Sequence, residues 1–258
     1  MANKSWDAES YEQSCSFVYR FGADVTELLQ PFPGMKVLDL GCGSGVLTAG
    51  LAEKLNAVNG SVIGADASPD MLALAGKHYP AIPFLQKDAR FLDFDEEFDA
   101  VFSNAVFHWI DREEQHLLLD GVARALKPGG QLVCEFGGAG CGKKVHDALR
   151  AAFEKRGLNY KMSFYFPTIG EYAPRMEQAG LVLTDAFLFD RPTPMEGEAG
   201  LEKWIRMFVT APFTGLSDEL TGEIIAEAAD FLRPTMFDGE KWIIDYVRIR
   251  LRAVRRVL

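Results

Sequence analysis

Short apolar runs alternate along most of the chain with segments whose apolar residues recur at helical spacing. The runs predict strands at about 36–40, 61–65, 82–86, 99–103, 131–136, 181–189 and 246–254. Several runs are apolar on both sides of the strand, which is typical of parallel strands covered by helices on both faces. This alternation predicts an α/β fold with a doubly wound sheet of seven mostly parallel strands.

Helical spacing continues beyond the first five strands. It predicts helices at residues 142–155, 168–178, 201–208 and 218–231. The last two fall in an insertion at about 193–240, between the final two strands. Such an insertion would lie over the ligand end of the sheet as a small helical lid, and substrate specificity should reside there. Its aromatic residues, Trp204 and Phe208 among them, are expected to pack the lid.

The most informative pattern joins the first strand to the helix after it. The apolar run 37–40 contains a single acid, Asp39, and is followed by Gly41, Gly43 and Gly45 at alternate positions. Glycines in a strand-to-helix turn let backbone N–H groups and a cofactor approach closely. The pattern therefore predicts a site for a nucleotide-type cofactor.

Glycine spacing separates three kinds of cofactor loop. A dinucleotide loop needs a third glycine where Val46 stands, and a phosphate loop needs a Gly-Lys-Ser/Thr sequence that is absent here. The remaining pattern, Asp-x-Gly-x-Gly-x-Gly, resembles the glycine loop of class I S-adenosylmethionine-dependent methyltransferases. Since S-adenosyl-L-methionine has no pyrophosphate, a tight glycine turn preceded by an acid suits its methionine end.

This resemblance implies roles for the loop residues. Asp39 would face the amino group of the cofactor, directly or through water. The loop around the methionine end would consist of Gly41, Cys42, Gly43 and Gly45. Cys42 is expected to be a small residue that fits the turn and not a nucleophile.

The next strand ends in a second acid at a suitable distance. Asp66 stands at the carboxyl end of the run 61–65, where a carboxylate can accept hydrogen bonds from both ribose hydroxyls. Ser68 predicts a helix N-cap and Pro69 the first helical position, so Met71 would cover the adenine. Ala67 lies between these groups. The alternative is that Asp66 is only a loop residue after a strand.

Two further strand ends complete the expected pocket. By resemblance, Asp88 would accept a hydrogen bond from the adenine amino group, and the backbone N–H of Ala89 would donate to a ring nitrogen. Ser103 and Asn104 end the fourth strand, where an open parallel sheet holds its ligands. The resemblance makes both candidates for contacts with the methionine portion.

The candidate catalytic residues depend on the methyl acceptor. A hydroxyl or acidic carbon would be helped by a general base within about 3 Å, and His108, Tyr11 or His116 could serve. The alternative for His108 is a pocket wall or hydrogen-bonding partner. A carboxylate acceptor needs no base, and Arg206 or Arg233 would orient it instead.

The family resemblance covers roughly residues 11–136. Its ordering and the His108-Trp109 ending are most similar to a small-molecule branch that includes trans-aconitate and quinone-biosynthesis methyltransferases. It implies a Rossmann-like methyltransferase fold, with residues 1–258 as one domain and residues 1–30 as an N-terminal helical cap. The expected partner is a small-molecule acceptor. Its identity, the choice between O-, N- and C-methylation and the oligomeric state stay open.

Composition agrees with a cytoplasmic enzyme. The 258 residues are 48% apolar, enough to bury a three-layer core. No apolar run is long enough to span a membrane, and the N-terminus lacks a signal-peptide pattern, so a cytoplasmic location is expected. The four cysteines have no paired spacing, which indicates neither a metal site nor disulfides.

Charge argues against a nucleic-acid substrate. The formal net charge is −10, whereas phosphate binding needs an electropositive surface. One basic pattern runs against this net sign, because Arg248, Arg250 and Arg252 alternate with apolar residues and so share one face of the last strand. That face could be solvated or ion-paired, or it could recognise an anionic substrate.

Two other function classes stay open at this stage. One is a nucleotide-dependent oxidoreductase on a similar fold, which Val46 disfavours because it stands where the third glycine belongs. The other is a non-catalytic S-adenosylmethionine-binding protein that has lost its acceptor pocket. A different use of the cofactor, such as lipid cyclopropanation, is a further alternative.

Overall fold

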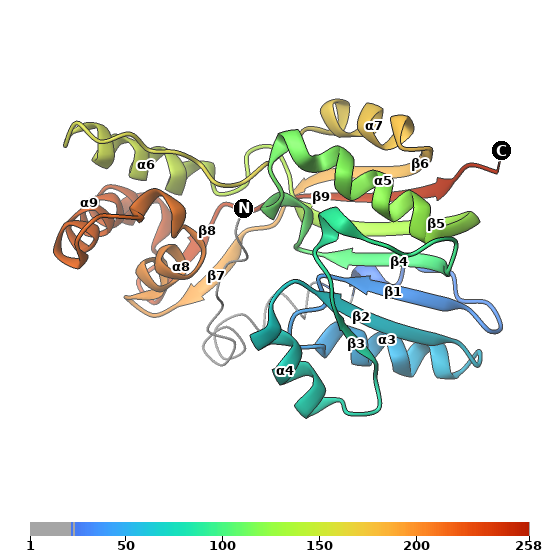
Figure 1. Cartoon of the computed structure of the whole chain (residues 1–258). Helices are drawn as coiled ribbons and strands as arrows, with labels where there is room; N and C mark the ends of the chain where they lie inside the picture. The colour runs from blue at the N-terminus through green and yellow to red at the C-terminus, as the bar shows by residue number, and fades with distance from the viewer. Residues whose placement is uncertain (1–21, 23, 258) are drawn as a thin grey trace.

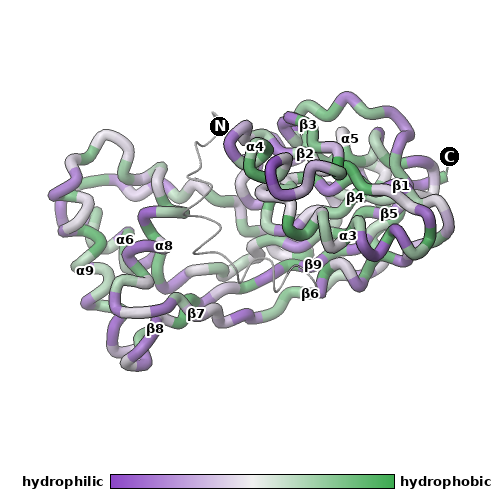
Figure 2. The backbone as a smooth tube through the Cα atoms, turned by 90° about the horizontal axis from the view of Figure 1, so that it is seen from below, coloured by the Kyte–Doolittle hydropathy of each residue, from purple (hydrophilic) through white to green (hydrophobic). Residues whose placement is uncertain are grey.

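The computed structural model describes residue 22 and residues 24–257, and these form two lobes (Figure 1, Figure 2). The larger lobe contains a seven-stranded sheet. Its strands are β1 (Lys36–Leu40), β2 (Ser61–Asp66), β3 (Phe84–Gln86), β4 (Phe98–Asn104), β5 (Leu126–Gly137), β6 (Leu181–Asp190) and β9 (Val247–Arg255). In space they follow the order β3-β2-β1-β4-β5-β9-β6. β9 runs antiparallel to both β5 and β6, and the other pairings in this sheet are parallel, so the expected doubly wound, mostly parallel sheet is confirmed.

Helices cover both faces of this sheet. The connecting helices are α3 (Val46–Asn56), α4 (Pro69–His78), α5 (Gln115–Ala125) and α7 (Ile169–Gln178). One core joins α5 and α7 to the sheet, and a second core joins α3 and Val25 to the opposite face. The two cores explain the mostly apolar strands, because a strand covered on both faces has no solvent side.

Local signals set where these helices begin. Ser68 is the N-cap of α4, as expected, and its hydroxyl accepts from the Met71 N–H at 3.3 Å, with Pro69 at the first position. Thr168 and Glu171 form a reciprocal capping box at the start of α7. These caps satisfy orphan N–H groups at the first helical turns.

The smaller lobe combines three helices with a two-stranded ribbon. Its elements are α6 (Lys143–Glu154), α8 (Gly200–Phe208), α9 (Asp218–Met236), β7 (Thr193–Glu196) and β8 (Lys241–Ile244). Its core is separate from those of the sheet and is built around residues such as Trp242, Ile205, Ile224 and Leu149. The segment 193–240 therefore contains a strand as well as the expected helices.

The position of α6 differs from what its place in the sequence suggests. It follows β5, yet it packs on α9 in the smaller lobe and not on the sheet (Figure 1). Gly140 and Gly142, with φ of 92° and 63°, let the chain turn away from the sheet just before α6. The buried side chains Val145, Leu149 and Phe153 then face α9.

β9 lies inside the sheet, and two of the three arginines on its basic face, Arg250 and Arg252, form ion pairs. Glu135 on β5 is 2% exposed and accepts from Arg250 at 2.7 Å and from Arg191. Arg252 lies 3.7 Å from Asp185. The ion-paired alternative is therefore correct for Arg250 and Arg252.

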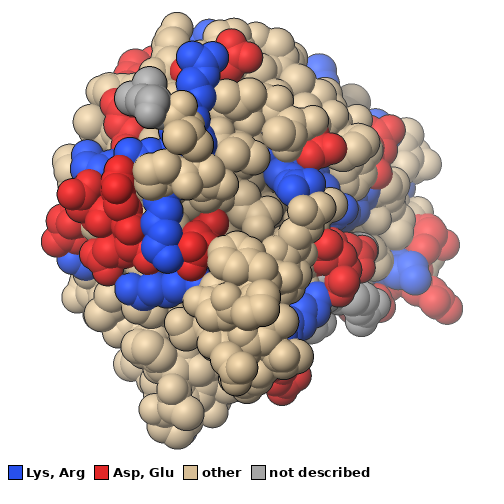
Figure 3. Space-filling model, turned by 90° about the vertical axis from the view of Figure 1, so that its right-hand side faces the viewer, with Lys and Arg blue, Asp and Glu red and all other residues tan. Residues whose placement is uncertain are grey.

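The far end of the sheet has locally balanced charges. Figure 3 shows this face, where Lys and Arg lie among Asp and Glu. The ion pairs at the amino ends of the parallel strands include Lys36–Glu97, Lys127–Asp99 and Arg255–Glu96, at 3.3, 2.7 and 2.9 Å. Within the described chain, this face therefore offers no continuous basic surface of the kind that binds a phosphate backbone.

Three further observations concern the described residues only. No helix among them is long and apolar enough to cross a membrane. They contain no group of His, Cys, Asp and Glu side chains that could hold a metal ion. Cys42, Cys134 and Cys141 are buried free thiols.

We predict that Glu135→Gln destabilises the protein by about 3 kcal/mol, because it leaves two largely buried guanidinium groups without their carboxylate. Urea unfolding at pH 7 measures this change. Asp185→Asn is the matched control, since its ion pair with Arg252 is longer and more exposed and should contribute less than about 1 kcal/mol. Equal losses in the two variants would contradict the prediction.

Candidate cofactor and acceptor site

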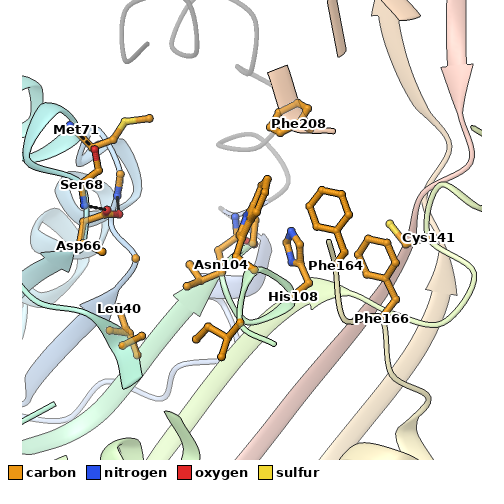
Figure 4. A pocket seen from close by; sticks show the side chains of 18 of the residues that line it. Leu40, Asp66, Ser68, Met71, Asn104, His108, Cys141, Phe164, Phe166 and Phe208 are labelled. Carbon is orange, nitrogen blue, oxygen red and sulfur yellow. Dashed lines mark hydrogen bonds between the residues drawn. The ribbon is translucent and has the colours of Figure 1, made fainter. Parts of the chain in front are cut away.

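One cavity lies at the carboxyl ends of β1, β2 and β4 and extends to the smaller lobe. The strand order reverses here, because β1 pairs with β2 on one side and with β4 on the other. The connections from β1 and β4 therefore leave on opposite faces and open a crevice between them. Figure 4 shows Asp66 and Met71 at one end of the cavity, His108 and Phe166 at the other, and Asn104 between them.

The glycine loop has no side chain on its cavity side. Gly41 has a φ of 78°, and a Cβ there would lie 2.1 Å from Val106 Cγ2, so only glycine fits. Gly43 also has a positive φ, of 54°, but a Cβ there would meet nothing within 4 Å because the loop faces the cavity. This is the close-approach surface that the glycine spacing predicts.

Asp66 joins the loop to the start of α4. Its Oδ2 accepts from the Gly43 N–H at 2.9 Å, and its Oδ1 accepts from the Ser68 N–H at 2.8 Å (Figure 4). Burial raises the pKa of this carboxyl, while the backbone N–H donors oppose that rise. Each oxygen keeps a lone pair, so the carboxylate can accept further bonds from a ligand in the cavity.

Asp39 lies beneath the loop and does not line the cavity. Its side chain is 2% exposed, and its Oδ2 accepts from the Thr48 hydroxyl at 2.7 Å. Burial raises its pKa to about 7, with a smaller contribution from the charge of Asp66. In this structure Asp39 ties β1 to α3, so any contact of its carboxylate with a ligand would be indirect.

Asp88 and Ala89 line the cavity beyond β3, beside Met71. Asp88 accepts from the side chain of Arg90 through both carboxylate oxygens, which lowers the pKa of Asp88. Arg90 also donates to Glu114 at 2.9 Å. The carboxylate of Asp88 is therefore held in place and ionised at the mouth of the expected adenine site.

The structure brings most of the expected cofactor residues to this cavity. The ones that line it are Gly41, Gly43, Asp66, Ala67, Met71, Asp88, Ala89 and Asn104. Four lie behind it: Asp39, Cys42, Gly45 and Ser103. Ser103 donates to the Leu40 carbonyl at 2.7 Å, because alternate residues of a strand point to opposite faces. Tyr11 lies outside the described residues.

His108 lies at the far end of the cavity on a short helical turn, residues 107–109. The buried amide of Gln115 donates to the carbonyls of Phe107 and Ile110, at 2.9 and 2.8 Å, and accepts from the Tyr172 hydroxyl. These bonds hold the turn and the imidazole in one orientation.

The tautomer of His108 follows from its surroundings. Burial lowers the pKa of the imidazole well below its usual value, so the ring is neutral at pH 7. Its Nδ1 accepts from the Gly137 N–H at 3.2 Å, so the proton of the neutral ring is on Nε2. His108 can therefore donate a hydrogen bond through Nε2 but is poorly suited to act there as a base.

Aromatic rings from both lobes enclose the cavity beyond His108. Phe164 and Phe166 stack with centroids 5.3 Å apart, and Trp109 meets Phe164 edge-on at 4.7 Å. The ring centroid of Trp204 on α8 lies 6.4 Å from that of His146 on α6. The expectation that the lid aromatics only pack the lid is therefore incomplete.

Sequence reasoning missed most of this chamber. The missed lining residues are Cys141, Gly142, His146, Phe164, Phe166 and Tyr246. Arg248, named from the sequence only as one of three arginines on a basic strand face, also lines the chamber. The i, i+4 spacing of Trp204 and Phe208 on one helix could have indicated a shared face. The candidate general base His116 does not line the cavity. Arg206 and Arg233, expected to orient a carboxylate acceptor, do not line it either. Arg206 pairs with Glu202 at the surface.

Known proteins are similar to this chain in sequence. The family described as "Methyltransferase domain" matches residues 37–130. The chain is 28% identical to a trans-aconitate 2-methyltransferase of Deinococcus radiodurans, over 97% of this chain and 98% of that one. An uncharacterized methyltransferase of Schizosaccharomyces pombe is 27% identical, over 98% and 99% of the two chains.

Solved structures share the fold. The YcgJ protein from Bacillus subtilis superposes with a TM-score of 0.64 at 18% identity, covering 93% of this chain and 100% of that one. A Haemonchus contortus phosphoethanolamine N-methyltransferase 2 bound to S-adenosyl-L-methionine superposes with a TM-score of 0.58 at 18% identity. The match covers 92% of this chain and 53% of that one. The protein is an S-adenosylmethionine-dependent methyltransferase. The resemblance stated from the sequence is confirmed, and the oxidoreductase alternative has no support in these matches.

Asp39 provides a test of the buried loop support. Because its folded pKa is raised, the carboxyl takes up a proton on folding, and its stabilising contribution is lost as pH rises from about 4 through about 7. We predict that Asp39→Asn removes this dependence. The free energy of unfolding, measured with urea, should fall from pH 5 to pH 8 in the parent. In the variant this fall should be smaller by about 2–3 kcal/mol.

The exposed Asp70, in the first turn of α4, provides the control. Asp70→Asn should follow the parent protein across the same pH range. A parallel pH dependence in the parent and Asp39→Asn proteins would mean that Asp39 is ionised at neutral pH.

Proposed function

We propose that the protein methylates a small organic molecule bound in the aromatic chamber next to its S-adenosylmethionine site. The observation that carries this proposal is the continuity of the cavity. It runs from the glycine loop past Asn104 and His108 to residues of the smaller lobe. A site enclosed by two lobes suits an acceptor of limited size.

The residues present fit S-adenosylmethionine. The open side of Gly43 leaves room for the methionine end. Asp66 has acceptor capacity at the end of β2 for the ribose hydroxyls, and Asp88 with Ala89 supplies an acceptor and a backbone donor for the adenine. When bound, the cofactor supplies an activated methyl group, so the chain needs no metal for the transfer.

The contribution of the chain is then alignment and exclusion of water. Trp109, Phe164 and Phe208 form an apolar wall from which water is readily displaced. His108 would donate from Nε2 to an oxygen of the acceptor, which replaces the expected role of general base. In-line displacement at a methyl group depends on placing the two reacting atoms, and the rigid turn that carries His108 serves that placement.

The smaller lobe would act as the lid. Its helices α6 and α8 contribute His146, Trp204 and Phe208 to the cavity, so their position controls access. Residues 1–21 and 23 of the N-terminal cap expected at 1–30 lie outside the described residues, and the cap stays a prediction. A cytoplasmic location and an acceptor other than nucleic acid also stay predictions, and the net charge of −10 supports the second.

Calorimetric titration with S-adenosylhomocysteine tests the cofactor site. We predict that Asp66→Ala weakens binding by about 1–3 kcal/mol, roughly 5- to 150-fold, because the ribose hydroxyls lose a charged acceptor. Asp70→Ala is the matched control, because this exposed carboxylate is four residues away and outside the cavity.

A melting curve of each variant separates loss of the site from loss of the fold. If Asp66→Ala binds as the parent does, the assignment of Asp66 is wrong. If the parent binds neither S-adenosylhomocysteine nor S-adenosylmethionine, the proposed function itself fails.

A further inference from the structure

Arg248 differs from the other arginines on its strand. It is 9% exposed and lines the acceptor end of the cavity, whereas Arg250 and Arg252 pair with carboxylates. Its guanidinium lies 4.5 Å from the ring centroid of Tyr246. Within the described part of the chain it makes neither an ion pair nor a hydrogen bond. A ring face attracts the cation but leaves the N–H donors unfilled.

The register of β9 brings this cation beside His108. Arg248 is the Cα partner of Gly137, whose N–H holds His108 Nδ1. Burial lowers the pKa of His108, and the positive charge of the neighbouring Arg248 lowers it further. The guanidinium and the Nε2–H of His108 are thus neighbouring donors on the cavity wall.

The other lysine and arginine side chains that line the cavity pair with carboxylates. Lys87 pairs with Asp93, and Arg90 pairs with Asp88 and Glu114, all at the cofactor end. Burial lowers the pKa of His146 to about 4, so this ring is neutral at pH 7. Asp245, three residues before Arg248, does not form an ion pair with it. Its Oδ2 accepts a hydrogen bond from the Lys144 N–H at 2.9 Å.

The guanidinium of Arg248 faces the cavity, so a bound anion would gain charge-assisted hydrogen bonds from its N–H donors. The walls around it are aromatic, with Phe164 and Phe166 stacked nearly parallel at 11°. A flat guest can stack on an aromatic ring that faces the cavity. A single charged donor group favours one anionic group on that guest.

We propose that Arg248 is a specificity-determining residue that holds the carboxylate of a flat, aromatic or conjugated acceptor, with His108 Nε2–H as a second donor. This inference rests on the proposed function, because it names the class of acceptor for the same site. Arg248 would then orient an acidic acceptor, a role that was expected from the sequence for Arg206 or Arg233.

Binding of matched acids and amides tests the inference. The probes are benzoate, cinnamate and indole-3-acetate, each compared with its neutral amide, titrated into the complex with S-adenosylhomocysteine. We predict that at least one acid binds about 10- to 100-fold more tightly than its amide, and that Arg248→Met abolishes this preference. Arg248→Lys should retain part of it, because the positive charge remains.

Arg206→Met is the matched control, since it removes an arginine of α8 that is exposed and paired with Glu202. It should keep the preference for the acid. The affinity for S-adenosylhomocysteine should be unchanged in the Arg248 variants, which also shows that they fold. If S-adenosylhomocysteine binds but no acid exceeds its amide, or if Arg248→Met keeps the preference, this inference fails while the proposed function stands. If Arg248→Met lost affinity for S-adenosylhomocysteine as strongly as for the acid, Arg248 would belong to the cofactor site, and this inference would also fail.

Discussion

The insertion of β9 between β5 and β6 is the constraint on which the rest of the structure depends. Its hydrogen bonds join the parallel part of the sheet to β6, and the segment between β6 and β9 in the chain forms most of the smaller lobe. Because β9 is antiparallel, its first residues lie at the carboxyl ends of the parallel strands. Glu135 stabilises this position by neutralising the charges of Arg191 and Arg250 inside the sheet.

The same strand creates a division of charge along the cavity. At the cofactor end, carboxylates dominate, and the nearby cations are paired. At the acceptor end, two neutral histidines and several aromatic rings surround Arg248. Low polarity around one cation strengthens its attraction for an anion, since fewer water dipoles screen it. The geometry that closes the sheet thus also determines what the chamber can select.

Local patterns were enough to predict much of the fold and of the cofactor end. The glycine spacing, the acid at the end of β2 and the N-cap at Ser68 each depend on a few consecutive residues. Such signals are readable because turns and caps are short-range structures. The strand pattern did not show which side chain faces the cavity, so Asp39 and Ser103 were expected there although they point behind it.

Patterns of neighbouring residues were sufficient to predict the fold class, the cofactor loop and the class of enzyme. The acceptor chamber could be seen only in the folded chain, because its walls come from segments far apart in the sequence: the turn after β4, the segment after α6, helix α8 and the start of β9. The tertiary structure also decided that Arg248, of three arginines in one alternating pattern, is the one without a carboxylate partner in the described chain. Periodicity reports the face of a strand, but the charge that meets that face depends on the neighbouring strands.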